Sequence, residues 1–117
     1  MKRKTIRKHA DFLTPLDGPN ITLNNVITVR IKTAKIKDDA RYGIIASKRL
    51  FKFAVQRNRV KRILRDWIFY NEDLMLPQFD YIFIAGAEIL NINREDGREY
   101  IKRALTKISQ DYAEKNL

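Results

Sequence analysis

The side chains best suited to bind a charged ligand lie in one basic stretch, residues 47–66. Eight of these twenty residues are Lys or Arg, namely Lys48, Arg49, Lys52, Arg57, Arg59, Lys61, Arg62 and Arg65. The only acidic residue between Arg41 and Asn71 is Asp66, whereas a solvated helix face usually mixes charges of both signs. Like charges at this density repel one another unless a polyanion neutralises them. The stretch therefore predicts a site for phosphate groups, whose oxygens match the planar guanidinium group of Arg.

The second half of this stretch has the periodicity of an amphipathic helix that begins near Ala54 and ends near Tyr70 or Asn71. Apolar residues recur at intervals of three and four, namely Val60, Ile63, Leu64, Trp67 and Ile68. At about 100° per residue, the opposite side carries Asn58, Lys61, Arg62 and Arg65, with Arg57 and Arg59 at its borders. The alternative is an ordinary solvated face. The scarcity of acids favours instead a helix with one buried stripe and one phosphate-binding stripe.

Charge is unevenly distributed along the 117 residues. Residues 1–65 contain 18 Lys and Arg against 4 Asp and Glu, a net charge of +14, and residues 66–117 contain 6 against 10, a net charge of −4. These values account for the total of +10. We therefore expect a single domain, residues 1–117, with one basic surface built on its early elements.

Catalytic motifs are absent from the sequence. His9 is the only histidine, there is no cysteine, and no glycine-rich phosphate loop or cluster with metal-ligand spacing occurs. The acid pairs at 38–39, 72–73 and 95–96 suit helix capping or solvation better than catalysis. We expect no catalytic residue, no bound metal and no self-contained hydrolytic site. The apolar runs are also too short for a membrane helix, and the basic start lacks the apolar segment of a secretory signal.

Two segments closely resemble the protein subunit of bacterial ribonuclease P. They are residues 41–49, Arg-Tyr-Gly-Ile-Ile-Ala-Ser-Lys-Arg, and residues 57–65, Arg-Asn-Arg-Val-Lys-Arg-Ile-Leu-Arg. The shared pattern is an Arg-Asn-Arg helix preceded by a Gly-containing strand that ends in a basic pair. The resemblance implies a cytoplasmic ribonucleoprotein in which the RNA subunit removes the 5′ leader of precursor tRNA with Mg²⁺. The protein would bind RNA without a cofactor of its own, a membrane or an obligate protein partner.

The resemblance also assigns roles to particular residues. The RNA subunit would contact Lys48, Arg49, Lys52, Arg57, Asn58, Arg59, Lys61, Arg62 and Arg65. The leader would lie in a cleft lined by Phe12, Arg30 and Lys32. Residues 48–55 lack the glycine that is common in the family, and we expect Phe51 and Phe53 to pack against the helix start, with stacking on RNA as the alternative.

The remaining sequence predicts the scaffold. We expect a helix over Lys2 to Leu13, strands over Ile21 to Leu23, Val26 to Thr33, Tyr42 to Ser47 and Phe79 to Ala87, and a final helix capped by Asn93 or Asp96. In the second strand, Ile27, Val29 and Ile31 should face the core, while Thr28, Arg30 and Lys32 face solvent. The final helix should bury Ile101, Ala104, Leu105, Ile108 and Tyr112.

These elements predict an α+β fold, a two-layer α/β sandwich with a mixed sheet of about four strands and three helices. The resemblance implies the ribosomal protein S5 domain 2-like version of this fold, with a left-handed βαβ crossover. The general preference is for right-handed connections, so the handedness is taken from the resemblance alone.

Three other functions fit the composition. A ribosomal or ribosome-assembly protein would share the basic charge and a related fold. A free-standing nuclease would need a catalytic constellation, which the sequence lacks. A membrane-surface helix would use the same apolar stripe that must cover the sheet.

Overall fold

The computed structural model describes residues 4–5, 20–33 and 41–115. Its strands are β1 (Lys4–Thr5), β2 (Asn20–Leu23), β3 (Ile27–Thr33), β4 (Arg41–Ile45) and β5 (Phe79–Ala85). Its α-helices are α2 (Ala54–Tyr70) and α3 (Arg94–Lys115), and short 3₁₀ helices cover Glu72–Leu74 and Ile89–Asn91. The basic helix therefore has the limits that its periodicity predicts.

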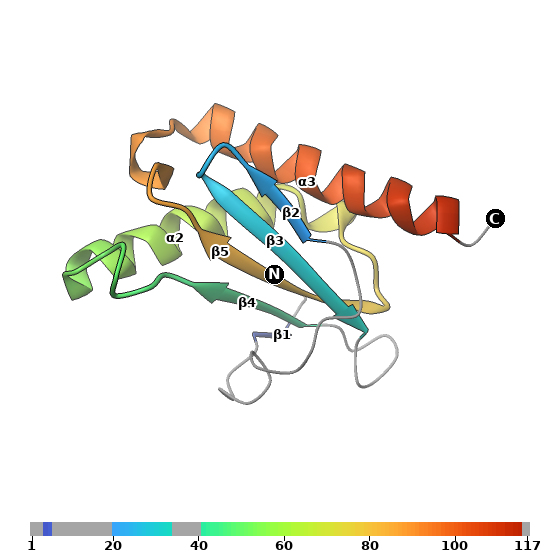
Figure 1. Ribbon diagram of the computed structural model, residues 1–117, viewed down its shortest axis with the longest axis horizontal. Coiled ribbons are helices and arrows are strands. Elements are labelled where there is room, and N and C mark those ends of the chain that lie inside the picture. Colours follow the sequence, from blue (N-terminus) through green and yellow to red (C-terminus); the bar gives the residue numbers. More distant parts are fainter. Residues whose placement is uncertain (1–3, 6–19, 34–40, 116–117) are drawn as a thin grey trace.

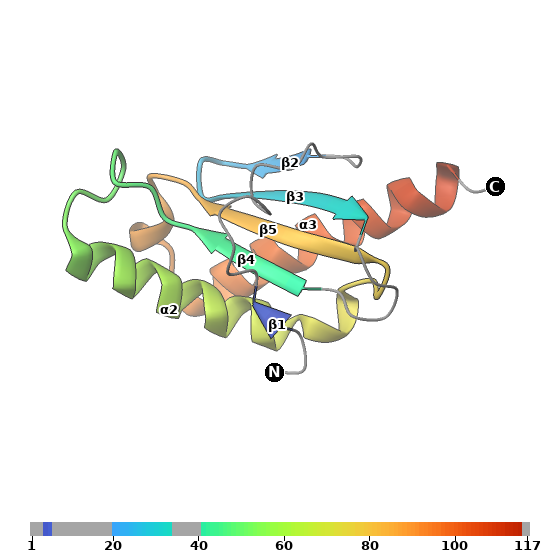
Figure 2. The same cartoon turned by 90° about the horizontal axis from the view of Figure 1, so that it is seen from below.

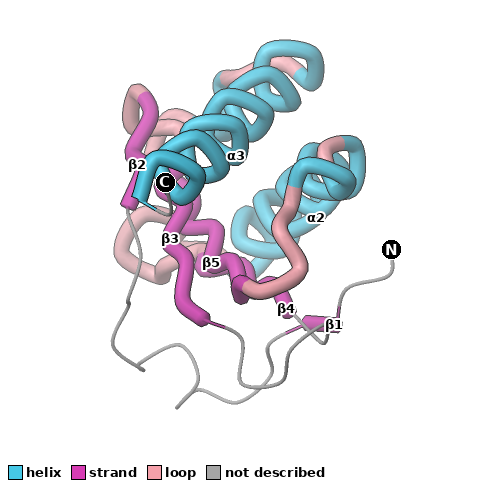
Figure 3. Tube along the Cα trace, turned by 90° about the vertical axis from the view of Figure 1, so that its right-hand side faces the viewer, coloured by secondary structure: helices cyan, strands magenta, loops and turns pink. Residues whose placement is uncertain are grey.

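The strands form one mixed sheet in the order β1-β4-β5-β3-β2 (Figures 1 and 2). β4 runs parallel to both β1 and β5, while β3 pairs antiparallel with β5 and β2. Both α-helices lie on the same side of the sheet, with α2 against β4 and β5 and α3 against β2 and β3 (Figure 3). This arrangement is the predicted α+β sandwich, with α2 connecting the parallel strands β4 and β5.

The number of elements differs from the prediction. The described residues contain two α-helices where three were expected, and five strands where about four were expected. Lys4–Thr5 pair with β4 as a strand, so the predicted N-terminal helix is wrong at these two positions. The rest of that helix lies outside the described residues.

Alternating apolar residues of the central strands form the part of the core that the sheet contributes. Ile27, Val29 and Ile31 are buried as predicted, and in the ladder they face Ala85, Phe83 and Tyr81. Helix α2 adds Val60, Leu64, Trp67 and Ile68, and helix α3 adds Ile101, Ala104, Leu105 and Ile108. Full burial of each large apolar side chain contributes about 1.5–3 kcal/mol. This packing fixes which side of α2 faces away from the sheet.

Tyr112 marks the edge of the apolar stripe on α3. Its side chain is 37% exposed, so the prediction that it is buried was too strong. Its ring still packs edge-on against Phe79, with the centroids 5.2 Å apart.

The start of α3 is shaped for close contact with α2. Asn93 caps the helix, because its Oδ1 accepts a hydrogen bond from the backbone N–H of Asp96 at 2.8 Å. A Cβ atom at Gly97 would lie 2.0 Å from the ring of Trp67. Glycine usually costs about 1 kcal/mol in a helix relative to Ala, but here it gives the Trp67 ring room to pack.

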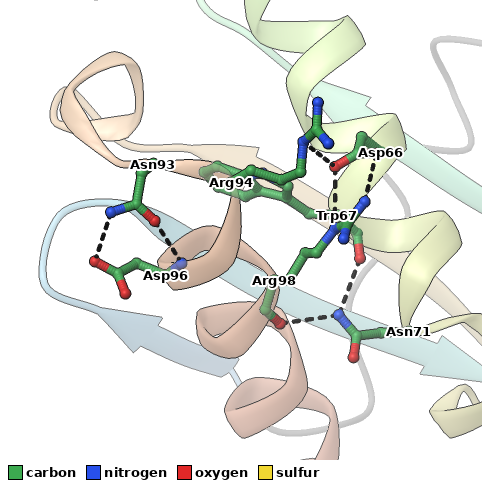
Figure 4. Close-up of polar contacts among 7 residues, drawn as sticks. All are labelled: Asp66, Trp67, Asn71, Asn93, Arg94, Asp96 and Arg98. Atoms are coloured by element: carbon green, nitrogen blue, oxygen red, sulfur yellow. Dashed lines mark hydrogen bonds and ion pairs between the residues drawn. The ribbon is translucent and has the colours of Figure 1, made fainter.

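Hydrogen bonds between polar groups also join α2 to α3 near Trp67 (Figure 4). The buried Asn71 donates from Nδ2 to the carbonyls of Trp67 and Arg98, both at 2.9 Å. The guanidinium of Arg98 in turn donates to both carboxylate oxygens of Asp66, at 3.0 and 3.3 Å. These bonds give hydrogen-bond partners to polar groups at the C-terminal end of α2 and hold it against α3.

Candidate nucleic-acid interface

The face of α2 that points away from the sheet is cationic and open. Asn58, Arg59, Arg62 and Arg65 are exposed, and Lys61 is half-buried. These side chains and Val55 surround a shallow hollow on the helix surface. The structure therefore brings together the residues that the helical periodicity placed on this side.

Within residues 41–115, no acidic side chain neutralises Arg59, Lys61, Arg62 or Arg65. Asp66 is the single acid of the helix, and it turns toward α3 instead. There it pairs with Arg98 at 3.0 Å and, more loosely, with Arg94 at 4.0 Å. The helix surface thus keeps four positive charges for an external anion.

Arg57 has a structural contact that its position in the motif did not reveal. Its Nη1 donates hydrogen bonds to the carbonyl oxygens of Phe51 at 2.9 Å and Lys52 at 3.1 Å. Both carbonyls belong to the connection between β4 and α2. Charge-assisted hydrogen bonds of this kind are stronger than neutral ones, so Arg57 holds this connection against the helix that follows it.

The connection itself presents three further cations. Lys48, Arg49 and Lys52 are exposed, next to the start of α2. Ser47 shapes this segment, because its carbonyl accepts from the N–H of Phe51 at 2.9 Å and its Oγ accepts from the N–H of Leu50 at 3.2 Å. The exposed cations of the connection and of α2 thus follow one another in the sequence, over residues 48–65.

The two phenylalanines of the connection have opposite environments. Phe51 is 2% exposed and belongs to the core, as predicted. Phe53 is 63% exposed, so the prediction that it packs against the helix start was wrong. The physical reason is its position as the N-cap of α2, where an extended backbone (φ −97°, ψ 142°) places it before the apolar stripe that covers the sheet.

The sheet face opposite the helices contains two of the three residues predicted to contact the leader, Arg30 and Lys32. Arg30 is exposed there. Lys32 is only 4% exposed, so its predicted place on a solvated surface was wrong. Lys32 lies directly across the ladder from Asp80, which is fully buried. Phe12, the third predicted leader contact, lies outside the described residues.

The fully buried Asp80 has its polar partner on β4. Its carboxylate accepts hydrogen bonds from the backbone N–H of Arg41 at 2.7 Å and from the Arg41 guanidinium at 3.1 Å. A buried charge needs a partner of this kind. Lys32 is the neighbour of Asp80 on the other side, in the β3–β5 ladder. The sequence analysis missed the Arg41–Asp80 pair because Asp80 lies inside an apolar run.

A second hollow lies where α2 meets the start of α3. Its lining combines apolar side chains with charged ones, namely Arg62, Ile63, Asp66, Trp67, Ile92 and Arg94. Arg62 borders both hollows. The cationic surface therefore continues from α2 toward Arg94.

The described residues form neither a metal-binding cluster nor a membrane-spanning helix. No group of three or more His, Cys, Asp or Glu side chains in the described ranges is arranged to hold a metal ion. Neither α2 nor α3 has an apolar stretch long enough to cross a membrane.

The fold and this surface together define a small α+β protein with exposed cations on one helix and on the loop before it. The chain belongs to the ribonuclease P family, whose sequence model matches residues 1–109.

Individual relatives agree with this assignment. The ribonuclease P protein component of Desulforapulum autotrophicum is 32% identical over 107 residues, which cover 92% of this chain and 90% of the relative. The Staphylococcus aureus RNase P protein superposes with a TM-score of 0.72 at 28% identity, covering 90% of this chain and 94% of that one. The Thermotoga maritima RNase P protein has a TM-score of 0.74 at 22% identity, covers 91% and 98%, and supports the fold alone. The chain is thus similar throughout to subunits of this ribonuclease.

Proposed function

We propose that this chain is the protein subunit of a cytoplasmic ribonuclease P ribonucleoprotein, where it binds the catalytic RNA subunit through α2 and the preceding loop. The observation that carries this proposal is the set of cations on α2 that no acid of the described residues neutralises. An RNA backbone supplies phosphates at regular spacing, and each neutralised phosphate releases counterions.

The opposite face of the sheet is proposed to bind the 5′ leader of precursor tRNA. Arg30 is an exposed cation on that face, and Phe12 is the aromatic residue that the family resemblance assigns to the same cleft. Lys32 lies on the same strand but is buried, so it is assigned a structural role.

The chemistry of cleavage is proposed to come from the RNA subunit and its Mg²⁺ ions. The protein contributes binding, so that the leader and the catalytic RNA are held together at lower metal concentrations. Binding of this kind raises the rate through positioning of the reactants. The proposal assigns no catalytic residue to the protein.

The test is cleavage of a precursor tRNA at low Mg²⁺ by a bacterial ribonuclease P RNA transcribed in vitro, with and without this protein. We expect the protein to restore leader removal and to cleave nothing without the RNA. Arg59→Ala combined with Arg62→Ala should weaken the effect. The matched control, Lys102→Ala with Arg103→Ala, removes the same charge from exposed positions of α3 and should retain it.

Two results would contradict the proposal. Cleavage by the protein alone would indicate a free-standing nuclease. No stimulation of any bacterial ribonuclease P RNA, combined with tight binding to ribosomal RNA, would favour the ribosomal or ribosome-assembly function.

A further inference from the structure

Large apolar side chains are exposed at the start of α2, within the most basic part of the surface. Leu50 is 41%, Phe53 63% and Val55 79% exposed. Lys52 and Arg49, which neighbour them in sequence, are exposed as well. Single exposed apolar residues are common, but a group of three inside a cationic binding surface indicates an interaction site.

The backbone that carries the Phe53 ring is held on both sides. The N–H of Phe53 donates to Oε1 of Gln56 at 3.2 Å, and its carbonyl accepts from the N–H of Arg57 at 3.2 Å. The carbonyl of the preceding residue, Lys52, accepts from the Arg57 guanidinium at 3.1 Å. The backbone position of Phe53 is therefore fixed. A partner that contacts its ring loses little binding free energy to ordering of the protein.

The surrounding charge selects the kind of partner. A second copy of this chain would bring the same cations into contact, and like charges across an interface are unfavourable. A single-stranded nucleotide offers the complementary pair of groups, a phosphate for Lys52 or Arg49 and a flat base for the Phe53 ring. Aromatic side chains stack on any base, because every base has a π-face.

We infer that Phe53 stacks on an unpaired base of the RNA that binds the cationic face of α2. This inference rests on the proposed function and extends it, because it adds a base contact to an interface otherwise made of charges. Phe53 fixes one nucleotide at the first turn of the helix, while the cations that follow along α2 bind the phosphates of the chain.

The test compares the affinities of wild type, Phe53→Leu and Phe53→Tyr for a bacterial ribonuclease P RNA transcript at several salt concentrations. Phe53→Leu keeps an apolar side chain but removes the ring, and we expect the Kd to rise about 5- to 150-fold. Phe53→Tyr keeps the ring and should bind like wild type. The dependence of log K on log salt should be the same for all three proteins, because no charge changes.

The matched control is Phe69→Leu, at a residue that is 57% exposed near the opposite end of α2. It should leave the Kd unchanged. Thermal melting should give similar midpoints for all variants, because the ring of Phe53 is exposed and its capping bonds use the backbone.

Several outcomes would overturn the inference. The first is wild-type affinity in Phe53→Leu, and the second is a loss in Phe53→Tyr as large as that in Phe53→Leu. A third is self-association of the free protein that Phe53→Leu abolishes, since the ring would then serve a second copy. If wild type itself fails to bind the RNA, the proposed function fails and the inference with it, whereas a failure confined to the Phe53 comparison leaves the proposed function intact.

Discussion

Removal of two arginines from the exposed face of α2 should change the salt dependence of RNA binding by a calculable amount. The connection and α2 present eight cations between residues 48 and 65. If each neutralises one phosphate, log K should fall against log salt with a slope of about −6 to −7, at roughly 0.7–0.9 per phosphate. Arg59→Gln with Arg62→Gln removes two contacts, so the slope should become shallower by about 1.5.

The assay is a titration of labelled ribonuclease P RNA with protein between about 50 and 200 mM monovalent salt, the range over which such slopes are measured. Wild type should lose roughly 10⁴-fold in affinity across this range and the double variant roughly 10³-fold. The control variant Lys102→Gln with Arg103→Gln removes the same charge from α3 and should keep the wild-type slope.

The reasoning is refuted if the two double variants change the slope equally. That result would mean that the overall charge of the protein attracts the RNA and that α2 makes no defined phosphate contacts. It is also refuted if the α2 variant loses affinity by a constant factor at all salt concentrations.

Three further predictions concern side chains inside the fold, and each is measured by chemical denaturation. Gly97→Ala should lower the free energy of unfolding by about 1–3 kcal/mol, because the added methyl overlaps the Trp67 ring. An unchanged denaturation midpoint would contradict this close contact between the helices. Arg57→Ala should cost about 1.5–3 kcal/mol through its lost bonds to loop carbonyls, and a variant that loses only RNA affinity would contradict that role. Lys32→Ala should also destabilise the domain, because the Lys32 side chain is 4% exposed and its truncation removes buried packing; intact stability with loss of leader-dependent cleavage would instead restore its role as a leader contact.

The basic helix could be predicted from sequence almost to the residue. Its apolar spacing is regular, and Val60, Leu64 and Trp67 are all buried as that spacing requires. The sequence also narrowed the N-cap of the last helix to Asn93 or Asp96, of which the structure shows Asn93, because capping depends on local geometry within four residues. Helix periodicity and capping depend on residues close together in the sequence, so a local sequence pattern is enough to predict them.

Burial of the second sheet face could not be predicted in this way. Alternation assigned Lys32 correctly to the face away from the helices, but it says nothing about what covers that face. Its cross-strand neighbour Asp80 is 48 residues away in the chain and lies within an apolar strand. That the two are neighbours becomes visible only once the register between β3 and β5 is known.

One local signal was overlooked. Asn24 and Asn25 both have positive φ, 46° and 57°, and the N–H of Val26 donates to the carbonyl of Leu23 at 2.9 Å. Two such residues form the tight turn that suits the twist of a two-stranded hairpin. Asn-Asn between two short alternating segments would have predicted the β2–β3 hairpin directly.

The burial of Trp67 has a practical consequence for spectroscopy. It is the only tryptophan of the chain, it is 1% exposed, and its ring lies against Gly97 on the side of α2 that faces α3. Its emission therefore reports whether the two helices are docked, while the exposed cationic surface of the same helix contains no indole. Intrinsic fluorescence can distinguish a variant that has lost its fold from a variant that has lost only its ligand, without any attached dye.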